Sequence, residues 1–282
     1  MLRAKGSGVY RLEHLTKAFD GGVIAVNDVS LKIGAGEQVA IIGPSGAGKT
    51  TLFRILNLTV RQTHGTLWIK EQEVGALRGA ALRRMRRRIG TVYQQHNLVS
   101  RLRVLHNVLA GRLGDWSLPR ALGSLLAPRA EDVRAAREAL AQVGIPEKLW
   151  ARTDVLSGGQ QQRVAIARVL VQRPEVILAD EPVSSVDPTL AQGIVGVLVE
   201  LSGAFQTTLA MNLHSVDLAL AHFPRVIGFR DGRVVFDRPS AEVSDDLLAA
   251  LYAGQTETAP EAMDTPDGSP SVTSCLPPLR SN

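Results

Sequence analysis

Short apolar runs alternate with turn residues and with amphipathic segments along most of this chain. Continuous apolar runs of strand length predict buried strands at Val39–Ile42, Glu175–Ala179 and Thr207–Asn212. A further short strand is expected at Gly65–Ile69. Because strands and helical segments alternate, the pattern indicates βαβ units and an α/β fold with a parallel sheet.

Helical spacing of apolar residues marks further segments between these strands. The predicted helices are Lys49–Leu58, Ala80–Arg88, Arg103–Leu113, Glu131–Val143 and Gly158–Val171. Between the third and fourth helices lies Gly114–Arg129, an insert broken by Pro and Gly. Near the C-terminus, Val226–Phe229 and Val234–Phe236 flank an Asp-Gly pair, which predicts a β-hairpin.

The composition is that of a folded protein. Of the 282 residues, 45% are hydrophobic and 21% charged, which excludes a mainly disordered or fibrous chain. The single cysteine, Cys275, excludes a disulfide framework or a cysteine zinc cluster. No apolar run approaches the ~18 residues of a membrane span, and the N-terminus lacks the apolar core of a signal peptide. We expect a soluble intracellular chain that reaches a membrane only through a partner. Gln255–Asn282, rich in Pro, Ser, Thr and acidic residues, is expected to be a disordered tail.

The most specific local pattern lies between the first buried strand and the helix after it. It reads Gly43-Pro44-Ser45-Gly46-Ala47-Gly48-Lys49-Thr50 and matches the phosphate loop G-x-x-x-x-G-K-[ST]. Its glycines let backbone N–H groups approach a polyphosphate, and the N-terminus of the next helix favours the anion. Lys49 would reach the β- and γ-phosphates, and the Thr50 hydroxyl would ligate Mg²⁺. The pattern therefore predicts nucleotide binding.

Two acidic residues, Asp180 and Glu181, end the second apolar strand. Ligands of parallel sheets bind at the carboxyl ends of the strands, where these side chains would emerge. Asp180 is placed to hold Mg²⁺ directly or through water, and Glu181 could accept a proton from the attacking water. Alone, such a pair is more often a solvated turn, but the upstream phosphate loop favours the metal and water roles.

A second anion-binding end is predicted at Ser157-Gly158-Gly159-Gln160, which opens an amphipathic helix. The N–H groups and the positive end of that helix would face a phosphate. Taken in isolation, the same residues could be a helix N-cap with a flexible entry.

Together, Gly43–Thr50, Leu156–Gln160 and Val176–Glu181 resemble the nucleotide-binding subunit of ATP-binding cassette (ABC) transporters. The resemblance covers about Val9–Tyr252. It implies an α/β P-loop NTPase with a RecA-like core, an N-terminal antiparallel β subdomain and an α-helical signature subdomain at about residues 95–172.

Other family positions follow in order along the chain. Gln94 matches the glutamine that in the family senses Mg²⁺ and contacts the membrane subunit, and Ser184–Asp187 matches the D-loop. His214 matches the switch histidine, and Phe19 lies where the family places an aromatic residue against adenine. The resemblance thus assigns catalysis to Glu181 and His214.

The cofactors implied by the resemblance are ATP and Mg²⁺. The implied nucleotide-binding residues are Phe19, Gly43, Pro44, Ser45, Gly46, Ala47, Gly48, Lys49, Thr50, Thr51, Gln94, Ser157, Gly158, Gly159, Gln160 and Asp187, and the implied metal ligands are Thr50, Gln94 and Asp180. In the family, two subunits pair head to tail as a homodimer. Ser157 and Gly159 would then contact the γ-phosphate bound at Lys49 of the other copy, so hydrolysis would open the dimer.

Gln94–Gly111 looks especially like the phosphonate-import branch of the family, which also has segments similar to Gly114–Arg129 and Asn212–Ala219. The likeness implies an ATP hydrolase that powers uptake of a phosphonate or a phosphite-like anion. Its partners would be two transmembrane permease subunits and an extracytoplasmic substrate-binding protein, and it would lie peripherally on the cytoplasmic face of the inner membrane. An importer of amino acids or of the lipoprotein type is the alternative, since the cassette never touches the transported solute.

Much of the net charge of +5 is concentrated in Arg83–Arg88, and clustered arginine can bind nucleic acid. DNA-repair cassettes carry long coiled coils between the glutamine that Gln94 matches (the Q-loop glutamine) and the Ser-Gly-Gly turn that Ser157–Gly159 matches (the signature turn). Here about 60 residues separate Gln94 from Ser157, without sustained heptads. A solvated helix face, near anionic lipid headgroups, is therefore expected, with no nucleic-acid partner. The signature turn also argues against a simple P-loop kinase.

Overall fold

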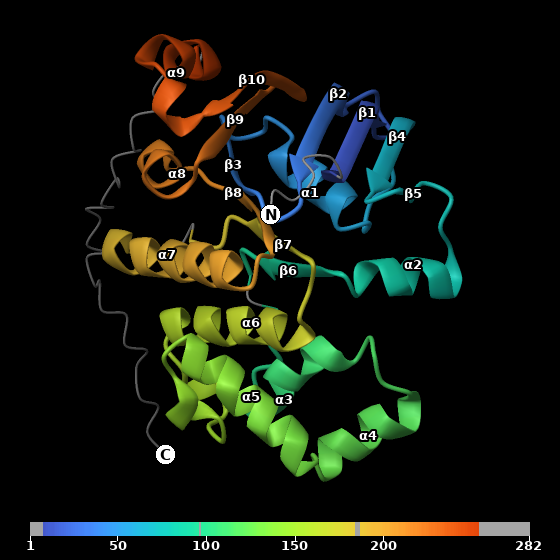
Figure 1. The fold of residues 1–282 in the computed structure, drawn as a ribbon, viewed down its shortest axis with the longest axis vertical. Helices are drawn as coiled ribbons and strands as arrows, with labels where there is room; N and C mark the ends of the chain where they lie inside the picture. Colours follow the sequence, from blue (N-terminus) through green and yellow to red (C-terminus); the bar gives the residue numbers. More distant parts are fainter. Residues whose placement is uncertain (1–7, 96, 184–186, 254–282) are drawn as a thin grey trace, which may run out of the picture.

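The computed structural model describes residues 8–95, 97–183 and 187–253, which form two β-sheets and a set of helices (Figure 1). One sheet is antiparallel with the order β2-β1-β4-β5, and the other has the order β10-β9-β3-β8-β7-β6. The strands are β1 (Gly8–Ala18), β2 (Ile24–Gly34), β3 (Gln38–Ile42), β4 (His64–Ile69), β5 (Gln72–Glu73), β6 (Ile89–Tyr93), β7 (Val176–Asp180), β8 (Thr208–Asn212), β9 (Arg225–Arg230) and β10 (Arg233–Pro239).

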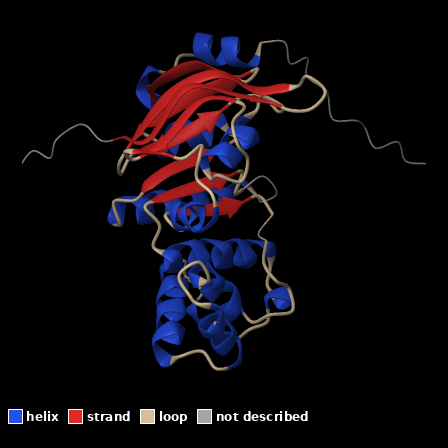
Figure 2. Ribbon diagram, turned by 90° about the vertical axis from the view of Figure 1, so that its right-hand side faces the viewer, coloured by secondary structure: helices blue, strands red, loops and turns tan. Residues whose placement is uncertain are grey.

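Helices cover the second sheet and form a block of their own. The α-helices are α1 (Lys49–Leu56), α2 (Gly79–Arg86), α3 (Val104–Leu109), α4 (Leu118–Leu126), α5 (Ala130–Gln142), α6 (Gly158–Gln172), α7 (Pro188–Ala204), α8 (Val216–His222) and α9 (Asp245–Tyr252). Helices α3 to α6 lie together below the sheets (Figure 1 and Figure 2). Within this block, α6 contacts α3 and α5, and it also contacts strand β6 of the sheet. In the part of the chain that the structure describes, no helix is both long enough and apolar enough to span a bilayer.

The central strands of the second sheet pair in parallel and are buried on both faces. In β3, Val39 and Ile41 enter the core beneath the antiparallel sheet, whereas Ala40 and Ile42 enter the core on the helical side. Strands β7 and β8 divide their side chains in the same way. This double burial is the reason that these strands read as continuous apolar runs rather than as alternating patterns.

The α/β class is confirmed, with a largely parallel central sheet and an N-terminal antiparallel sheet. The hairpin prediction is also confirmed: β9 and β10 pair antiparallel, and Asp231 and Gly232 both have positive φ, at 50° and 75°. Two positive φ angles match the right-handed twist of the flanking strands. The domain boundaries stay predictions, and Gln255–Asn282 lies outside the described residues.

The helical block departs from the predictions in two places. The expected helix Arg103–Leu113 ends at Leu109 and continues as a 3₁₀ turn, Ala110–Arg112. The insert Gly114–Arg129, expected to be broken by Pro and Gly, contains α4. Pro119 lies in the first turn of α4, where a missing N–H removes no hydrogen bond within the helix.

The parallel pairing brings several chain segments of interest to one edge of the central sheet. Tyr93, Asp180 and Asn212 are neighbours in register across β6, β7 and β8, and β3 lies beside β8. The phosphate loop, Glu181, Gln94 and His214 each follow the carboxyl end of one of these strands, and Asp180 is the last residue of β7. The topology therefore places them at the same edge.

Candidate functional site

The phosphate loop owes its shape to glycines that no other residue could replace without a shift of the backbone. Gly43 and Gly48 have φ of +152° and +100°, and a Cβ at either would lie 1.9 Å from a backbone oxygen, that of Phe229 or of Ala25. At Gly46, with φ of +78°, a Cβ would meet nothing within 4 Å. The loop is thus packed on one side and open on the other, which leaves backbone N–H groups accessible to an anion.

Lys49 begins α1 and is only 4% exposed. Its Nζ donates to the carbonyl oxygens of Gly43 and Pro44, at 2.7 and 2.9 Å. Burial lowers the pKa of the Lys49 ammonium, and the charges of Glu181 and Asp180 oppose that shift. The side chain therefore holds the loop in place and carries positive charge into it.

Asp180 ends β7 and lies between two hydrogen-bond donors. Asn212 Nδ2 donates to Asp180 Oδ1 at 2.7 Å, and Thr50 Oγ1 donates to the same oxygen at 3.4 Å. Burial raises the pKa of Asp180 above its ordinary value, Glu181 adds to this shift, and the two hydrogen bonds oppose it. The Thr50 hydroxyl and the Asp180 carboxylate form a set of oxygen donors, which is what Mg²⁺ requires.

Glu181 has an unusual backbone conformation for a residue with a Cβ, with φ of +49°. Its N–H donates to the carbonyl oxygen of Asn212 at 3.2 Å, and its Oε1 lies 2.7 Å from His214 Nε2. The backbone turn directs Glu181 away from Asp180 and toward the histidine. The two residues predicted to catalyse are therefore in direct contact.

A cavity of about 370 Å³ joins these parts. It is lined by Ala25, Ser45, Gly46, Ala47, Gly48, Lys49, Thr50, Thr51, Glu181 and His214. The phosphate loop and the predicted catalytic residues thus face one space. Among the described residues, this lining does not include Ser157, Gly158, Gly159 or Gln160.

The Ser157 turn opens α6 with a complete capping box. Ser157 Oγ accepts from the N–H of Gln160 at 3.4 Å, and Gln160 Oε1 accepts from the N–H of Ser157 at 3.1 Å. Ser157 and Gly158 are exposed, and Gly159 packs against Leu190 of α7. The turn is therefore an N-cap that leaves the N-terminus of α6 partly exposed, and its anion-binding role stays a prediction.

The other predicted site residues do not line the cavity at the phosphate loop. Gln94 follows β6 and is exposed. Phe19 is 42% exposed in the loop after β1, with Lys17 Nζ 4.8 Å from its ring centroid. Asp187 caps α7 by accepting from the N–H of Leu190 at 3.0 Å. Ser184–Val186 of the expected D-loop lies outside the described residues.

Sequence reasoning missed Asn212 as a site residue. It is fully buried and contacts both Asp180 and Glu181 through its amide. A signal was present, because Asn212 is the polar residue that ends an apolar strand, as Asp180 is in β7. Ala25, whose carbonyl oxygen packs on the phosphate loop, had no such signal.

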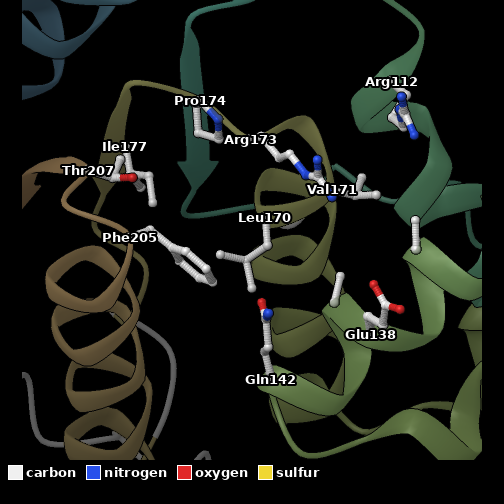
Figure 3. Close-up of a pocket in the computed structure, with 12 residues that line it drawn as sticks. Arg112, Glu138, Gln142, Leu170, Val171, Arg173, Pro174, Ile177, Phe205 and Thr207 are labelled. Carbon is white, nitrogen blue, oxygen red and sulfur yellow. The ribbon is translucent and has the colours of Figure 1, made fainter.

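Larger cavities lie elsewhere among the described residues. One of about 450 Å³ is lined by residues such as Arg112, Glu138, Leu170 and Phe205 and contains none of the predicted site residues (Figure 3). The second, which we call the arginine groove, measures about 760 Å³ and lies beside α2 and β6. Its arginines are Arg83, Arg84, Arg86, Arg87 and Arg168, and its other lining residues include Tyr93, Asn97 and Trp116.

The geometry defines a class of protein: a P-loop nucleotide-binding domain, in which a phosphate loop faces an Asp-Glu pair at the end of a parallel strand of the same sheet, with one strand between them. A model of the ABC transporter family matches residues 26–184. The chain belongs to the ABC transporter family, as the sequence predicts, and its fold and family role are those of an ATP-hydrolysing cassette.

Individual relatives are similar over nearly the whole chain. It is 48% identical to the phosphonates import ATP-binding protein PhnC of Pseudomonas fluorescens, over 91% of this chain and 96% of that protein. It is 50% identical to the phosphonates import ATP-binding protein PhnC 1 of Pseudomonas aeruginosa, over 89% of this chain and 92% of that protein.

Solved structures show the same fold. A dimeric ATP-binding cassette in a post-hydrolysis state, bound to ADP and Pi, aligns with a TM-score of 0.70 and 31% identity over 82% of this chain and 98% of that one. The structure of cbiO1 from Clostridium perfringens, part of an ABC transporter complex, aligns with a TM-score of 0.75 and 28% identity over 87% of this chain and 94% of that one.

Proposed function

We propose that this chain is the ATP-hydrolysing subunit of an importer for phosphonates or phosphite-like anions. The observation that carries the proposal is its 48–50% identity, over about nine tenths of its length, to phosphonate import ATP-binding proteins. The arrangement of Lys49, Glu181 and His214 around one cavity supports ATP hydrolysis as the reaction. Import of amino acids or of another small solute is the alternative, because nothing in this site contacts the cargo.

In this proposal the triphosphate lies on the open side of the phosphate loop, above Gly46 and Lys49. The Thr50 hydroxyl and the Asp180 carboxylate hold Mg²⁺, with Gln94 as a further oxygen ligand after β6. An ion held there would supply positive charge against the charge that develops on the phosphates. The donor set fits this ion, because the hydroxyl and the carboxylate oxygen are already neighbours at 3.4 Å.

Glu181 is the base that orients the attacking water and accepts its proton. Its Oε1 lies 2.7 Å from His214 Nε2. An oxygen engaged in that way is poorly placed to receive a proton from water. We expect the γ-phosphate to draw His214 to itself and so to release Glu181 for the reaction.

A second copy of the chain completes the site. The Ser157 turn exposes Ser157 and Gly158 to solvent, apart from the cavity at its own phosphate loop. Head-to-tail pairing would bring this turn to the γ-phosphate held by Lys49 of the other copy. Loss of that phosphate would then separate the pair.

The arginine groove is the surface proposed for the membrane-spanning permease subunits. Tyr93 lies in its lining, one residue before Gln94, so an occupant of the groove would contact the segment that carries Gln94. Helix α2, which supplies Arg83 and Arg84, lies at the outer edge of the molecule (Figure 1). The complex places this subunit peripherally on the cytoplasmic face of the inner membrane, opposite an extracytoplasmic substrate-binding protein.

Uptake of a radiolabelled phosphonate, in a strain that lacks this chain, tests the proposal. The parent chain should restore uptake, and the Glu181→Gln chain, expressed to the same level, should not. Uptake of a labelled amino acid through an unrelated system is the control and should not change. Phosphonate uptake that persists without this chain, or amino-acid uptake that depends on it, would overturn the proposed substrate.

A further inference from the structure

We propose that Asn212 is a positioning residue for hydrolysis: its buried amide holds the carboxylates of Asp180 and Glu181 in the divergent orientation that their two roles require. The inference rests on the proposed roles of these two acids. It adds a residue that neither the phosphate loop nor the acidic pair predicts.

The position of Asn212 is fixed by the sheet. It ends β8, which lies between β3, the strand before the phosphate loop, and β7, the strand that carries the acids. Asn212 pairs in register with Asp180. The other residues of β8 are buried as well, and Asn212 itself is 0% exposed. Its side chain can therefore turn only toward neighbours at the carboxyl edge.

The contacts of Asn212 go to both acids at once. The side-chain Nδ2 donates to Asp180 Oδ1 at 2.7 Å and lies 3.4 Å from Glu181 Oε1. The backbone carbonyl oxygen of Asn212 accepts from the N–H of Glu181 at 3.2 Å. Two of these bonds tie down the residue with positive φ, whose backbone turn separates the carboxylates. Asn212 is thus a single residue that contacts both acids, through its side chain and its backbone.

Charge balance explains why an amide suits this place. An amide N–H donor stabilises two adjacent carboxylates without adding a charge, and Lys49 already supplies the nearby positive charge. Asn212 cannot be turned over, because Oδ1 would then face carboxylate oxygens, which are also acceptors. The donor end of the amide therefore has to face the acids.

The remaining atom of the amide indicates that the residue is not there for stability. Among the described residues, Asn212 Oδ1 has no hydrogen-bond partner although it is buried. A buried acceptor without a partner destabilises the fold, and a leucine of similar size would avoid that loss. The benefit of an amide at this position is therefore the hydrogen bonding of its N–H groups to the two acids.

The test compares full-length Asn212→Leu and Asn212→Asp with the parent. Leucine keeps the volume and removes the donors, whereas aspartate places a third carboxylate where Nδ2 now lies 2.7 Å from Asp180. We expect kcat to fall about tenfold or more in both variants, with KM for ATP changed by less than about threefold, because the phosphate loop binds the triphosphate.

A binding measurement separates positioning from turnover. A fluorescent ATP analogue is titrated in EDTA and again in excess Mg²⁺. Affinity in EDTA should stay within about twofold of the parent, and the gain in affinity produced by Mg²⁺ should shrink about tenfold in both variants. Loss of affinity in EDTA to the same extent as in Mg²⁺ would mean that the loop itself is disturbed, and it would overturn the positioning role.

Asn107→Leu is the matched control. Asn107 is a buried amide in α3 that bonds to Val99 and Thr153, away from the acids. This variant should lower the melting temperature and leave the Mg²⁺-dependent gain unchanged. If Asn212→Leu behaves in the same way, with activity falling only in proportion to folded protein, Asn212 is merely structural and the inference is wrong.

Glu181→Gln, measured in parallel, keeps this inference distinguishable from the proposed function. It should bind ATP and fail to hydrolyse it. Hydrolysis by Glu181→Gln at the parent rate would overturn the role of Glu181. If Glu181→Gln is inactive and Asn212→Leu is fully active, only the positioning role of Asn212 is overturned.

Discussion

Replacing Gly48 with alanine tests whether the shape of the phosphate loop is dictated by space. Gly48 has φ of +100°, and an added Cβ would lie 1.9 Å from the carbonyl oxygen of Ala25 and 3.3 Å from Phe229 Cε1. Real Cβ atoms essentially never approach within 3.0 Å of such an atom. Because the obstacle is the backbone of β2 rather than a flexible side chain, strand and loop must move apart.

The magnitude follows from two contributions. Left-handed backbone costs an alanine about 1–2 kcal/mol, and overpacking against a backbone atom costs about 1–3 kcal/mol more. The sum is roughly 3 kcal/mol, which for a chain of this size lowers the melting temperature by roughly 6–12 °C. The measurement is thermal unfolding by circular dichroism without nucleotide.

Gly46→Ala is the control within the same loop. It has φ of +78°, but its Cβ would meet nothing within 4 Å, so only the backbone contribution of about 1–2 kcal/mol applies. Gly48→Ala should therefore melt well below Gly46→Ala. Equal melting temperatures for the two variants would show that the contact with Ala25 does not constrain the loop, and the reasoning from packing would fail.

Three further predictions concern charge and pairing. Lys49→Met should weaken binding of a fluorescent ATP analogue about a hundredfold, because the buried ammonium supplies the charge of the loop; an unchanged affinity would contradict this. Ser157→Arg should leave binding by a single chain intact and abolish ATP-driven dimerisation in light scattering, and a dimer of normal size would refute the role of the turn. Burial raises the pKa of Glu175, but hydrogen bonds from Arg88 and Lys70 outweigh it and hold that pKa below its ordinary value. This stabilisation exists above the ordinary carboxylate pKa and is lost as pH falls through the lowered one. Glu175→Gln should thus lower the melting temperature at neutral pH by the equivalent of less than about 1 kcal/mol, since the carboxylate is partly exposed, and a difference that persists in strong acid would argue against the ion pairs.

The sequence predicts best where local chemistry leaves no alternative. The phosphate loop is recognisable because its glycines must adopt positive φ beside the backbone of Phe229 and Ala25, and few other residues tolerate either condition. The Asp-Gly turn between β9 and β10 is recognisable for the same reason. Buried parallel strands are found as apolar runs because both of their faces enter a core.

Features that depend on neighbours distant in the chain escape the sequence. The amide of Asn212 bonds to Asp180, which lies 32 positions away in the chain. The two residues are close only because β7 and β8 pair in this register, which the sequence pattern does not predict. Asp187, expected to bind nucleotide, is seen as the cap of α7, and its nucleotide role stays a prediction. Helix α4 was missed because Pro119 looks like a break until its place in the first turn is known.

Among the described residues, the Ser157 turn does not line the cavity at the phosphate loop of its own chain, and this has a consequence for the effect of protein concentration. If each working centre needs parts from two molecules, turnover in dilute solution rises with the square of the amount of protein until all molecules are coupled. A defective copy that pairs with an active copy then also removes the activity of the active copy. Lost output should exceed the share of defective molecules in the mixture.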